Sequence, residues 1–349
     1  MSKRNYSQNA RNFFFIAVCA FLSATIFYAC NKTSDKALVV EEPLTLKSSD
    51  RLLSVANVYY ANNGKTVTAL FFETPLVHEF NAGIKNSVQY YNLLKEAKEK
   101  GLPINVRLAD PQLGLIEAVI AATPEQIKAF NDSKANMEAA EEVESPETIS
   151  TSNRRLTGVI PNVATLNTIF NTLRNQGCLA AGPILYGQCV PYQYVADGCY
   201  ARAHKMRQII EGTYGYTSYK VFNYADQCPA VPGVLAVKAS LWGNNCCVRW
   251  WYHVAPYVYV QSGASQVAYL LDPSMHSAPV AISTWLAAQK NTSCGYTTGT
   301  VHKQAYYTSP AYAPSGFNYG TCTITVAGDN TYTAANATCA AYAGRIGCF

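Results

Sequence analysis

The sequence predicts an α+β protein in which an antiparallel sheet with flanking helices follows a small N-terminal ββαββα domain. Three observations lead to this prediction. The 349 residues leave room for about two domains. Residues 31–155 contain no cysteine and carry 14 basic and 17 acidic residues, whereas residues 156–349 contain ten cysteines with 10 basic and 5 acidic residues. In both regions, β-like runs are interspersed with apolar residues at helical spacing.

The amino terminus has the form of an export signal. Lys3, Arg4 and Arg11 precede an apolar run over residues 13–29, which predicts a secretory signal peptide over residues 1–30. An uncleaved anchor is the alternative, although the run is short for a membrane span. Cys30 after Ala29 also resembles a bacterial lipoprotein site, so lipid attachment of the precursor at Cys30 stays open. Export places the later cysteines in an oxidising compartment, where disulfides persist.

Residues 31–137 have the pattern of a compact ββαββα domain. Runs at 52–60 and 66–73 flank the hairpin signal Asn62-Asn63-Gly64. A helical spacing over 84–94 ends at Gly101, strands are expected at 104–108 and 113–121, and a capping box at 123–126 predicts a helix over about 124–140. The only histidine within these residues, His78, has no evident partner. A pro-domain that folds with the second region or blocks it explains such a unit better than an independent enzyme.

Residues 138–155 form an acidic, Ser- and Thr-rich segment that ends in Arg154-Arg155. Such a composition buries too little apolar surface to offset the entropy of ordering it, so we expect an exposed linker. Exposed linkers are where proteases cut. Cleavage after Arg155 by a processing protease would release residues 156–349 as the mature domain, and a plain interdomain linker is the alternative.

Cys199 is the candidate nucleophile. Asp197 is expected to be the N-cap of a helix whose apolar face contains Ala203, Met206 and Ile210. Cys199 therefore falls in the first helical turn. Free backbone N–H groups and the helix dipole favour a thiolate there, and they can also bind an oxyanion. His204 lies about 140° around the helix and faces elsewhere. The alternative is that Cys199 is half of a disulfide.

His253 and Asp272 are the candidate partners of Cys199. The β-like run 248–260 places Trp251, His253 and Tyr257 on one face of the strand. A turn centred on residues 262 and 263 would set His253 directly opposite Asp272 on the next strand. A carboxylate at that position orients the imidazole of a nucleophile–base pair. Taken separately, a satisfied strand histidine and a turn-opening Asp-Pro are the alternatives.

This order of a cysteine on a helix N-terminus, then a histidine and an aspartate on adjacent strands, matches the layout of transglutaminase-like and papain-like cysteine hydrolases. More specifically, several motifs resemble the bacterial protein-glutaminase family known from Chryseobacterium; they lie at residues 159–167, 197–209, 246–248, 252–255, 272–274 and 291–295. The resemblance spans nearly all of 156–349. The sequence departs from the family at the longer stretch around 228–233, at Met275-His276 and in the final segment.

The resemblance implies a protein-glutamine glutaminase, which deamidates glutamine side chains of peptides and proteins to glutamate and releases ammonia. It also implies an inhibitory pro-region that is removed on maturation. By position, Cys199 corresponds to the nucleophile, His253 to the base and Asp272 to the orienting acid. Trp251, Tyr257 and Tyr200 are the candidate substrate-binding residues.

The expected partners are protein and peptide substrates with an accessible glutamine, the chain's own pro-region and a processing protease. The family reaction needs no cofactor or metal. Cys246-Cys247 lacks the usual spacing of a zinc site, so disulfides to separate partners are expected. A net charge of +5 without a Lys/Arg run argues against nucleic acid. We expect a secreted monomer.

Three alternatives stay open from the residues alone. The same Cys-His-Asp set serves a transglutaminase-like acyl transferase, in which an amine replaces water, and a papain-like cysteine peptidase, which creates new N-termini. The non-enzymatic alternative is a disulfide-rich secreted binding module in which Cys199 is bridged.

The cysteine count makes a further prediction. If Cys199 is free, nine cysteines remain after residue 156, so one more must be unpaired, and Cys228 in the longer stretch is the candidate. The remaining eight would form four disulfides; they are Cys178, Cys189, Cys246, Cys247, Cys294, Cys322, Cys339 and Cys348.

Overall fold

The computed structural model describes residues 45–111, 113–135, 137–146, 158–229, 232–242 and 245–347. The predicted signal segment with Cys30, the Arg154-Arg155 pair and Cys348 lie outside the described residues. Residues from Leu46 onward form one compact unit. We call its residues 46–146 the N-terminal part and its residues 158–347 the C-terminal part. No helix within the described ranges is long and apolar enough to cross a membrane.

The N-terminal part has the order βββαββα rather than the predicted ββαββα. Its elements are β1 (Arg51–Ala61), β2 (Thr66–Phe71), β3 (Thr74–Asn81), α2 (Ser87–Lys100), β4 (Pro103–Asp110), β5 (Leu115–Ala121) and α3 (Pro124–Ala135). The prediction missed β3 because the chain reverses at residues 72 and 73, inside a run of continuous β-like composition. Gly101 ends α2 at φ 63°, as expected. Thr123 and Gln126 form the predicted reciprocal capping box, since each backbone N–H donates to the other's side chain.

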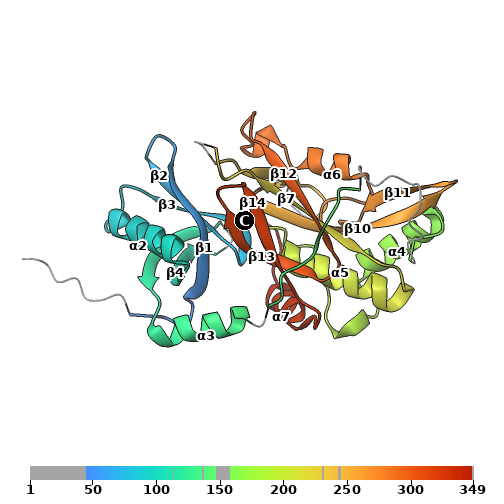
Figure 1. The fold of residues 1–349 in the computed structure, drawn as a ribbon, viewed down its shortest axis with the longest axis horizontal. Coiled ribbons are helices and arrows are strands. Elements are labelled where there is room, and N and C mark those ends of the chain that lie inside the picture. Colours follow the sequence, from blue (N-terminus) through green and yellow to red (C-terminus); the bar gives the residue numbers. More distant parts are fainter. Residues whose placement is uncertain are drawn as a thin grey trace, which may run out of the picture. The chain divides into compact units, whose positions relative to one another are not determined.

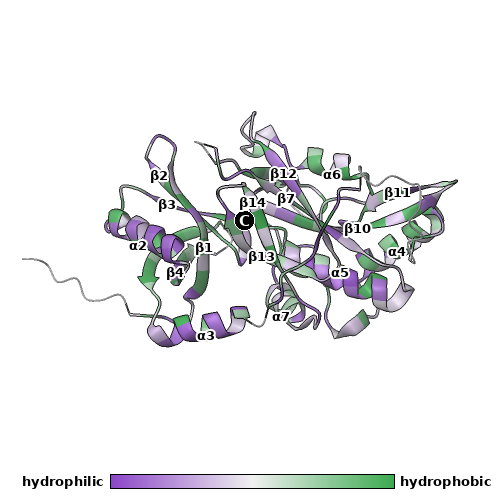
Figure 2. Cartoon of the chain, in the orientation of Figure 1, coloured by the Kyte–Doolittle hydropathy of each residue, from purple (hydrophilic) through white to green (hydrophobic). Residues whose placement is uncertain are grey.

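The strands of the N-terminal part form one sheet in the order β2-β1-β4-β5-β3, and β3 also pairs with β2. All of these ladders are antiparallel except the single β3–β5 pair. The helix α2 is largely hydrophilic (Figure 2) and buries Tyr90, Leu94 and Ala97 against the strands. His78 on β3 is fully buried, and its Nδ1 lies 2.9 Å from the Leu76 carbonyl oxygen.

The C-terminal part confirms the predicted α+β class (Figure 1). Its central sheet is antiparallel, with the order β11-β10-β7-β12-β6. Its own strands in this sheet are β7 (Tyr219–Ala225), β10 (Tyr252–Ser262), β11 (Ser265–Leu270) and β12 (His302–Thr308), and β6 (Glu142–Val143), from the end of the N-terminal part, adds the last strand. A separate hairpin is made of β13 (Ala311–Asn318) and β14 (Thr323–Gly328). The other elements are α4 (Val163–Asn175), α5 (Cys199–Tyr214), β8 (Leu235–Ala239), β9 (Cys246–Trp250), α6 (Ile282–Ala288) and α7 (Thr333–Tyr342).

The β10–β11 hairpin has a different register from the one predicted. Ser262 pairs with Ser265, so the turn is centred on residues 263 and 264, and the ladder ends at Tyr257 and Leu270. In the backbone ladder His253 pairs with Asn223 of β7, not with Asp272. The shift changes each pairing by two residues, and two residues restore the same face of a strand. Asp272 therefore stays on the side of the sheet that His253 faces.

The predicted continuous strand 248–260 is broken at Trp251. Strand β9 ends at Trp250, the chain bends at Trp251, and β10 begins at Tyr252. The bend interrupts the alternation of faces. Trp250 consequently stacks on His253, with ring centroids 4.4 Å apart, whereas Trp251 packs edge-on against Tyr252.

The two parts are joined at this bend. Leu76 of β3 pairs with Trp250 of β9, which extends the N-terminal sheet by β9 and β8. The Trp251 backbone N–H donates to the Pro75 carbonyl at 2.9 Å. The Trp251 indole N–H is directed at the carbonyls of Phe71 and Thr74, at 3.1 and 2.9 Å. The reversal between β2 and β3 is therefore fixed to one residue of the C-terminal part.

The first half of the predicted linker is exposed but not free. Ala140 donates its N–H to the Val326 carbonyl, and Gly328 donates to the Glu138 carbonyl, so residues 138–140 run along β14. Residues 142 and 143 form β6 and add to the edge of β12. Main-chain pairing is independent of side-chain type, which is why the acidic composition did not reveal it.

Three disulfides join described cysteines: Cys178–Cys189, Cys228–Cys322 and Cys247–Cys294. Cys246 is also disulfide-bonded. The free cysteines of the described ranges are Cys199 and Cys339, both buried. Two predictions were therefore wrong, since Cys228 is bonded and Cys339 is not. Cys339 lies on α7 in the same buried cluster as α5 residues, whereas the loop after β7 brings Cys228 to the β13–β14 turn.

Replacing Trp251 by Phe keeps the ring but removes the donor to two carbonyls of the N-terminal part. We expect a loss of about 1–3 kcal/mol in the free energy of unfolding of the full chain, measured with urea. Hydrogen exchange of the residue 251 amide should become faster, because its bond to Pro75 loses the neighbouring contacts. Tyr307→Phe, which removes a hydroxyl donor to Ile324 inside the C-terminal part, is the matched control. Unchanged exchange at residue 251 would contradict the joint described above.

Candidate active site

Cys199 is the first residue of α5, as predicted, but the cap differs from the prediction. The N-cap is Gly198, at φ 80°, and not Asp197. The Asp197 carboxylate instead accepts hydrogen bonds from the Gly198 N–H at 2.6 Å and the Tyr342 hydroxyl at 2.7 Å. A Cβ atom at Gly198 would lie 2.8 Å from the Tyr342 ring, so both the backbone angle and the packing favour glycine. This tight turn sets the start of α5 and thus the position of Cys199.

The Cys199 thiol is enclosed. It is 1% exposed and shares its buried cluster with Trp251 and Val254 of the C-terminal part. Ala56, Leu70 and Val77 of the N-terminal part belong to the same cluster. Burial raises the pKa of Cys199 to about 12, although the Arg202 charge and the Val254 backbone N–H act in the opposite direction. The thiolate expected from the helix N-terminus is thus disfavoured in the full chain, because desolvation outweighs the dipole.

His253, the second residue of β10, is held on several sides. Its Nε2 lies 2.8 Å from Asp272 Oδ2. The imidazole stacks on Trp250 and on Trp285 of α6, whose ring centroid lies 5.3 Å away. Its Nδ1 is buried and has no hydrogen-bond partner among the described residues. Burial lowers the pKa of His253, and the adjacent Asp272 carboxylate opposes that shift.

Asp272, just after β11, is a buried carboxylate with both oxygens bonded. Oδ2 accepts from His253 and from the Trp285 indole N–H at 3.0 Å. Oδ1 accepts from the Ser274 backbone N–H at 3.1 Å and from the Ser274 hydroxyl. Burial by itself raises the pKa of Asp272, but the bonds from His253, Ser274 and Trp285 outweigh it and depress that pKa well below its usual range. The carboxylate is therefore ionised and fixed.

The structure brings Cys199, His253 and Asp272 to the same end of β10. The Val254 backbone N–H lies close enough to the Cys199 thiol to lower its pKa, and the neighbouring residue along the strand is His253. A helix N-terminus, a strand and the end of the next strand thus meet around one thiol, one imidazole and one carboxylate. Chemically this set can provide a nucleophile, a base and an orienting acid.

Of the three candidate substrate-binding residues, two lie in the buried cluster of Cys199, namely Trp251 and Tyr200. Tyr257 does not. It packs with Ala255 and Trp285 in another cluster and stacks on Tyr219, at 5.3 Å between ring centroids. The prediction placed Trp251 and Tyr257 on one face because it assumed an unbroken strand. The bend at Trp251 separates them.

Sequence reasoning missed Trp250, Trp285 and Ser274, which hold the imidazole and the carboxylate. Ser274 follows Asp272 at the spacing of an Asx turn, so the Asp-Pro-Ser motif carried a usable signal. Trp285 carried none, because its role depends on the position of α6 beside β10. A cavity of about 330 Å³ borders this group. Its lining includes Val195, Lys238, Trp250, Ser274, Met275 and Asn291.

One cluster of metal-ligand type occurs within the described ranges, formed by Asp226, Cys228 and Cys322. Both sulfurs belong to a disulfide. They are therefore not available as thiolate ligands.

Comparisons with known proteins identify the family. The sequence profile of the family described as Glutaminase matches residues 166–289. A crystal structure of a pro-protein-glutaminase is 28% identical and covers 86% of this chain and 95% of its own, with a TM-score of 0.64. The protein-glutaminase from Chryseobacterium proteolyticum, solved by NMR, is 34% identical over 55% of this chain and 93% of its own, with a TM-score of 0.44.

This chain belongs to the protein-glutaminase family. The resemblance noted in the sequence is thereby confirmed. The match to a pro-protein-glutaminase extends over 86% of the chain, which includes both parts described above and is typical of a zymogen form. A search of curated proteins found no match.

Removing the indole N–H of Trp285 tests how strongly the buried carboxylate is held. Trp285→Phe leaves a ring against His253 but takes one donor from Asp272. We expect a loss of about 1.5–3 kcal/mol in the free energy of unfolding at neutral pH, because the bond is to a charged acceptor. Trp242→Phe is the control, since its indole donates to the neutral Pro273 carbonyl at 2.8 Å. It should cost only about 0.5–1.5 kcal/mol, and equal losses would argue against a charged acceptor.

Proposed function

We propose that this chain is the zymogen of a secreted protein-glutamine glutaminase with a transglutaminase- and papain-like cysteine-hydrolase arrangement. The observation that carries the proposal is the placement of Cys199, His253 and Asp272. Asp272 holds His253 through Nε2 and leaves Nδ1 without a partner, while the backbone N–H of the next residue, Val254, lies beside the Cys199 thiol. Nδ1 is therefore the nitrogen left to exchange a proton with the thiol.

The reaction follows from these roles. Cys199 transfers its proton to His253 Nδ1 and attacks the carboxamide carbon of a glutamine side chain. The protonated His253 then gives its proton to the departing ammonia, and a thioester remains. Water activated by His253 cleaves the thioester to glutamate and frees the thiol. Asp272, ionised throughout, keeps the imidazole in one orientation and stabilises its positive form.

The start of α5 supplies electrostatic help to the same reaction. The free N–H groups of its first turn are the proposed donors to the carbonyl oxygen that becomes negative, which is the role of an oxyanion hole. Trp251 and Tyr200, from the cluster around Cys199, are the proposed contacts for the substrate chain. No metal or organic cofactor enters these steps.

The N-terminal part acts as the inhibitory pro-region. Ala56, Leu70 and Val77 belong to the buried cluster of Cys199, and the reversal between β2 and β3 occupies the N–H groups of Trp251. We propose cleavage after Arg155 by a processing protease, after removal of a signal peptide over residues 1–30, and a monomeric mature enzyme of residues 156–349. Disulfides are typical of an oxidising compartment and support secretion.

The decisive experiment incubates the cleaved protein with a glutamine-containing peptide. We expect ammonia release and a mass gain of about one unit per peptide, because an amide becomes an acid, with no chain cleavage. Cys199→Ser should abolish both, since a hydroxyl is a far weaker nucleophile than a thiolate. Cys339→Ser, which removes the other free thiol, is the control and should keep activity. New N-termini would indicate a peptidase. Joining of an added amine to the glutamine side chain, with ammonia released but no glutamate formed, would indicate acyl transfer.

Thiol reactivity tests the inhibitory role separately. Burial raises the pKa of Cys199 to about 12, against an ordinary value of 9.0, so Cys199 in the full chain is a neutral thiol at physiological pH. Removal of the N-terminal part exposes it, lowers the pKa and increases the thiolate fraction. At pH 8 we expect alkylation by iodoacetamide to be at least about tenfold faster after processing, because the thiolate fraction and the access of the reagent both increase. Equal rates before and after processing would rule out enclosure by the N-terminal part.

A further inference from the structure

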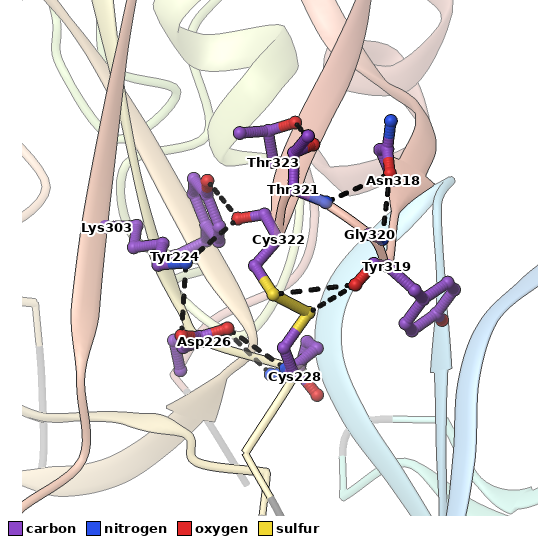
Figure 3. The surroundings of a disulfide bond; sticks show 12 residues. Tyr224, Asp226, Cys228, Lys303, Asn318, Tyr319, Gly320, Thr321, Cys322 and Thr323 are labelled. Carbon is purple, nitrogen blue, oxygen red and sulfur yellow. Dashed lines mark hydrogen bonds and ion pairs between the residues drawn. A yellow bond between two sulfur atoms is a disulfide. The ribbon is translucent and has the colours of Figure 1, made fainter.

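The turn between β13 and β14 is held firmly to the central sheet. The Cys228–Cys322 disulfide links it to the loop that follows β7, across 94 residues of sequence. The Cys322 carbonyl accepts hydrogen bonds from the Tyr224 hydroxyl at 3.1 Å and from Lys303 Nζ at 3.3 Å (Figure 3). Lys303 also forms an ion pair with Asp226 at 3.2 Å. The turn is thus fixed by one covalent and several polar contacts.

This fixed turn carries Tyr319, which contacts the N-terminal part. The Tyr319 hydroxyl donates to the Ala56 carbonyl of β1. Ala56 lies where the β1–β2 register shifts between Val55 and Asn57. On the other side, Lys98 of α2 places its ammonium 4.1 Å from the centre of the Tyr319 ring and donates to Asn57 Oδ1 at 2.8 Å. One side chain therefore engages two elements of the N-terminal part.

The interface around Tyr319 is not closely packed, so its directional contacts are important for the attachment. A cavity of about 170 Å³ lies at this place and is lined by residues of both parts, including Ala56, Phe72, Lys98, Phe317 and Tyr319. Side chains do not fill the interface here, so close packing contributes less than it does around Cys199. The directional contacts of Tyr319 carry the attachment. The orientation of Tyr319 in turn depends on the turn, and both disulfide sulfurs lie within 3.6 Å of its carbonyl oxygen.

We propose that the Tyr319 turn, braced by the Cys228–Cys322 disulfide, is a second anchoring surface for the chain's own N-terminal part, separate from the contacts over Cys199. Its partner surface is the β1 bulge at Ala56-Asn57 together with Lys98. The disulfide therefore helps to keep Cys199 covered before the linker is cut. The longer stretch around residue 228, which no catalytic role explains, supplies one half of this brace. The proposal rests on the inhibitory role of the N-terminal part.

The test measures alkylation of Cys199 by iodoacetamide in the intact full-length chain, with labelled peptides identified by mass spectrometry. Tyr319→Phe keeps the ring above Lys98 and removes only the hydroxyl. The double variant Cys228→Ser/Cys322→Ser removes the brace. Cys178→Ser/Cys189→Ser removes a disulfide of the loop after α4 and is the matched control. Cys339 in each chain reports general opening, since it is buried and free as well.

We expect Cys199 to label about tenfold faster in Tyr319→Phe, and at least as fast in the Cys228→Ser/Cys322→Ser variant, because each weakens one attachment of the cover. Labelling of Cys339 and of the control chain should match the wild type. Wild-type rates in both test variants would overturn the proposal, as would an equal rise at Cys339. If the double variant does not fold, Tyr319→Phe and Lys98→Met decide.

The labelling experiment does not depend on catalysis. If the cleaved protein released no ammonia from glutamine peptides, the proposed deamidation would fail while the labelling result could still stand. If deamidation held and labelling were unchanged, only the anchoring proposal would fail.

Discussion

The bend at Trp251 is the constraint on which the active-site region depends. Because the chain bends there, Trp250 turns toward His253 and stacks on it, while Trp251 turns toward the cluster of Cys199. The same bend presents the Trp251 backbone and indole N–H groups to the carbonyls of residues 71, 74 and 75. One local departure from a regular strand thus orients the imidazole and receives the N-terminal part.

The buried carboxylate of Asp272 is held by hydrogen bonds from within the C-terminal part. A charge removed from water is tolerated only when it is fully hydrogen-bonded, and Asp272 receives donors from His253, Trp285 and Ser274. All of these donors belong to the C-terminal part. The His253–Asp272 pair is therefore already formed in the full chain, and in the proposed activation it is the environment of Cys199 that loss of the N-terminal part would change. Activation of this kind uncovers a site and does not need to build one.

Sequence reasoning succeeded where a local rule controls the outcome. The capping box at Thr123 and the helix end at Gly101 depend on contacts within one turn. Cys199 was expected in the first turn of its helix because a helix start was assigned next to Asp197, and it is the first residue of α5. It failed where distant segments compete. Asp197 was expected to cap α5, but its carboxylate is engaged by Tyr342 from the far end of the chain, and Gly198 takes the cap position.

By itself, the sequence determined the α+β class, the position of Cys199 on its helix, and the face of the sheet shared by His253 and Asp272. The shared face was predicted correctly although the hairpin turn was not, because a shift of two residues preserves the face of a strand. Only the tertiary structure decided the break at Trp251, the extra strand β3, the pairing of Cys228 with Cys322 and the high pKa of the Cys199 thiol. Each of these depends on burial or contact between segments far apart in the chain, and periodicity along the sequence carries no information about such contacts.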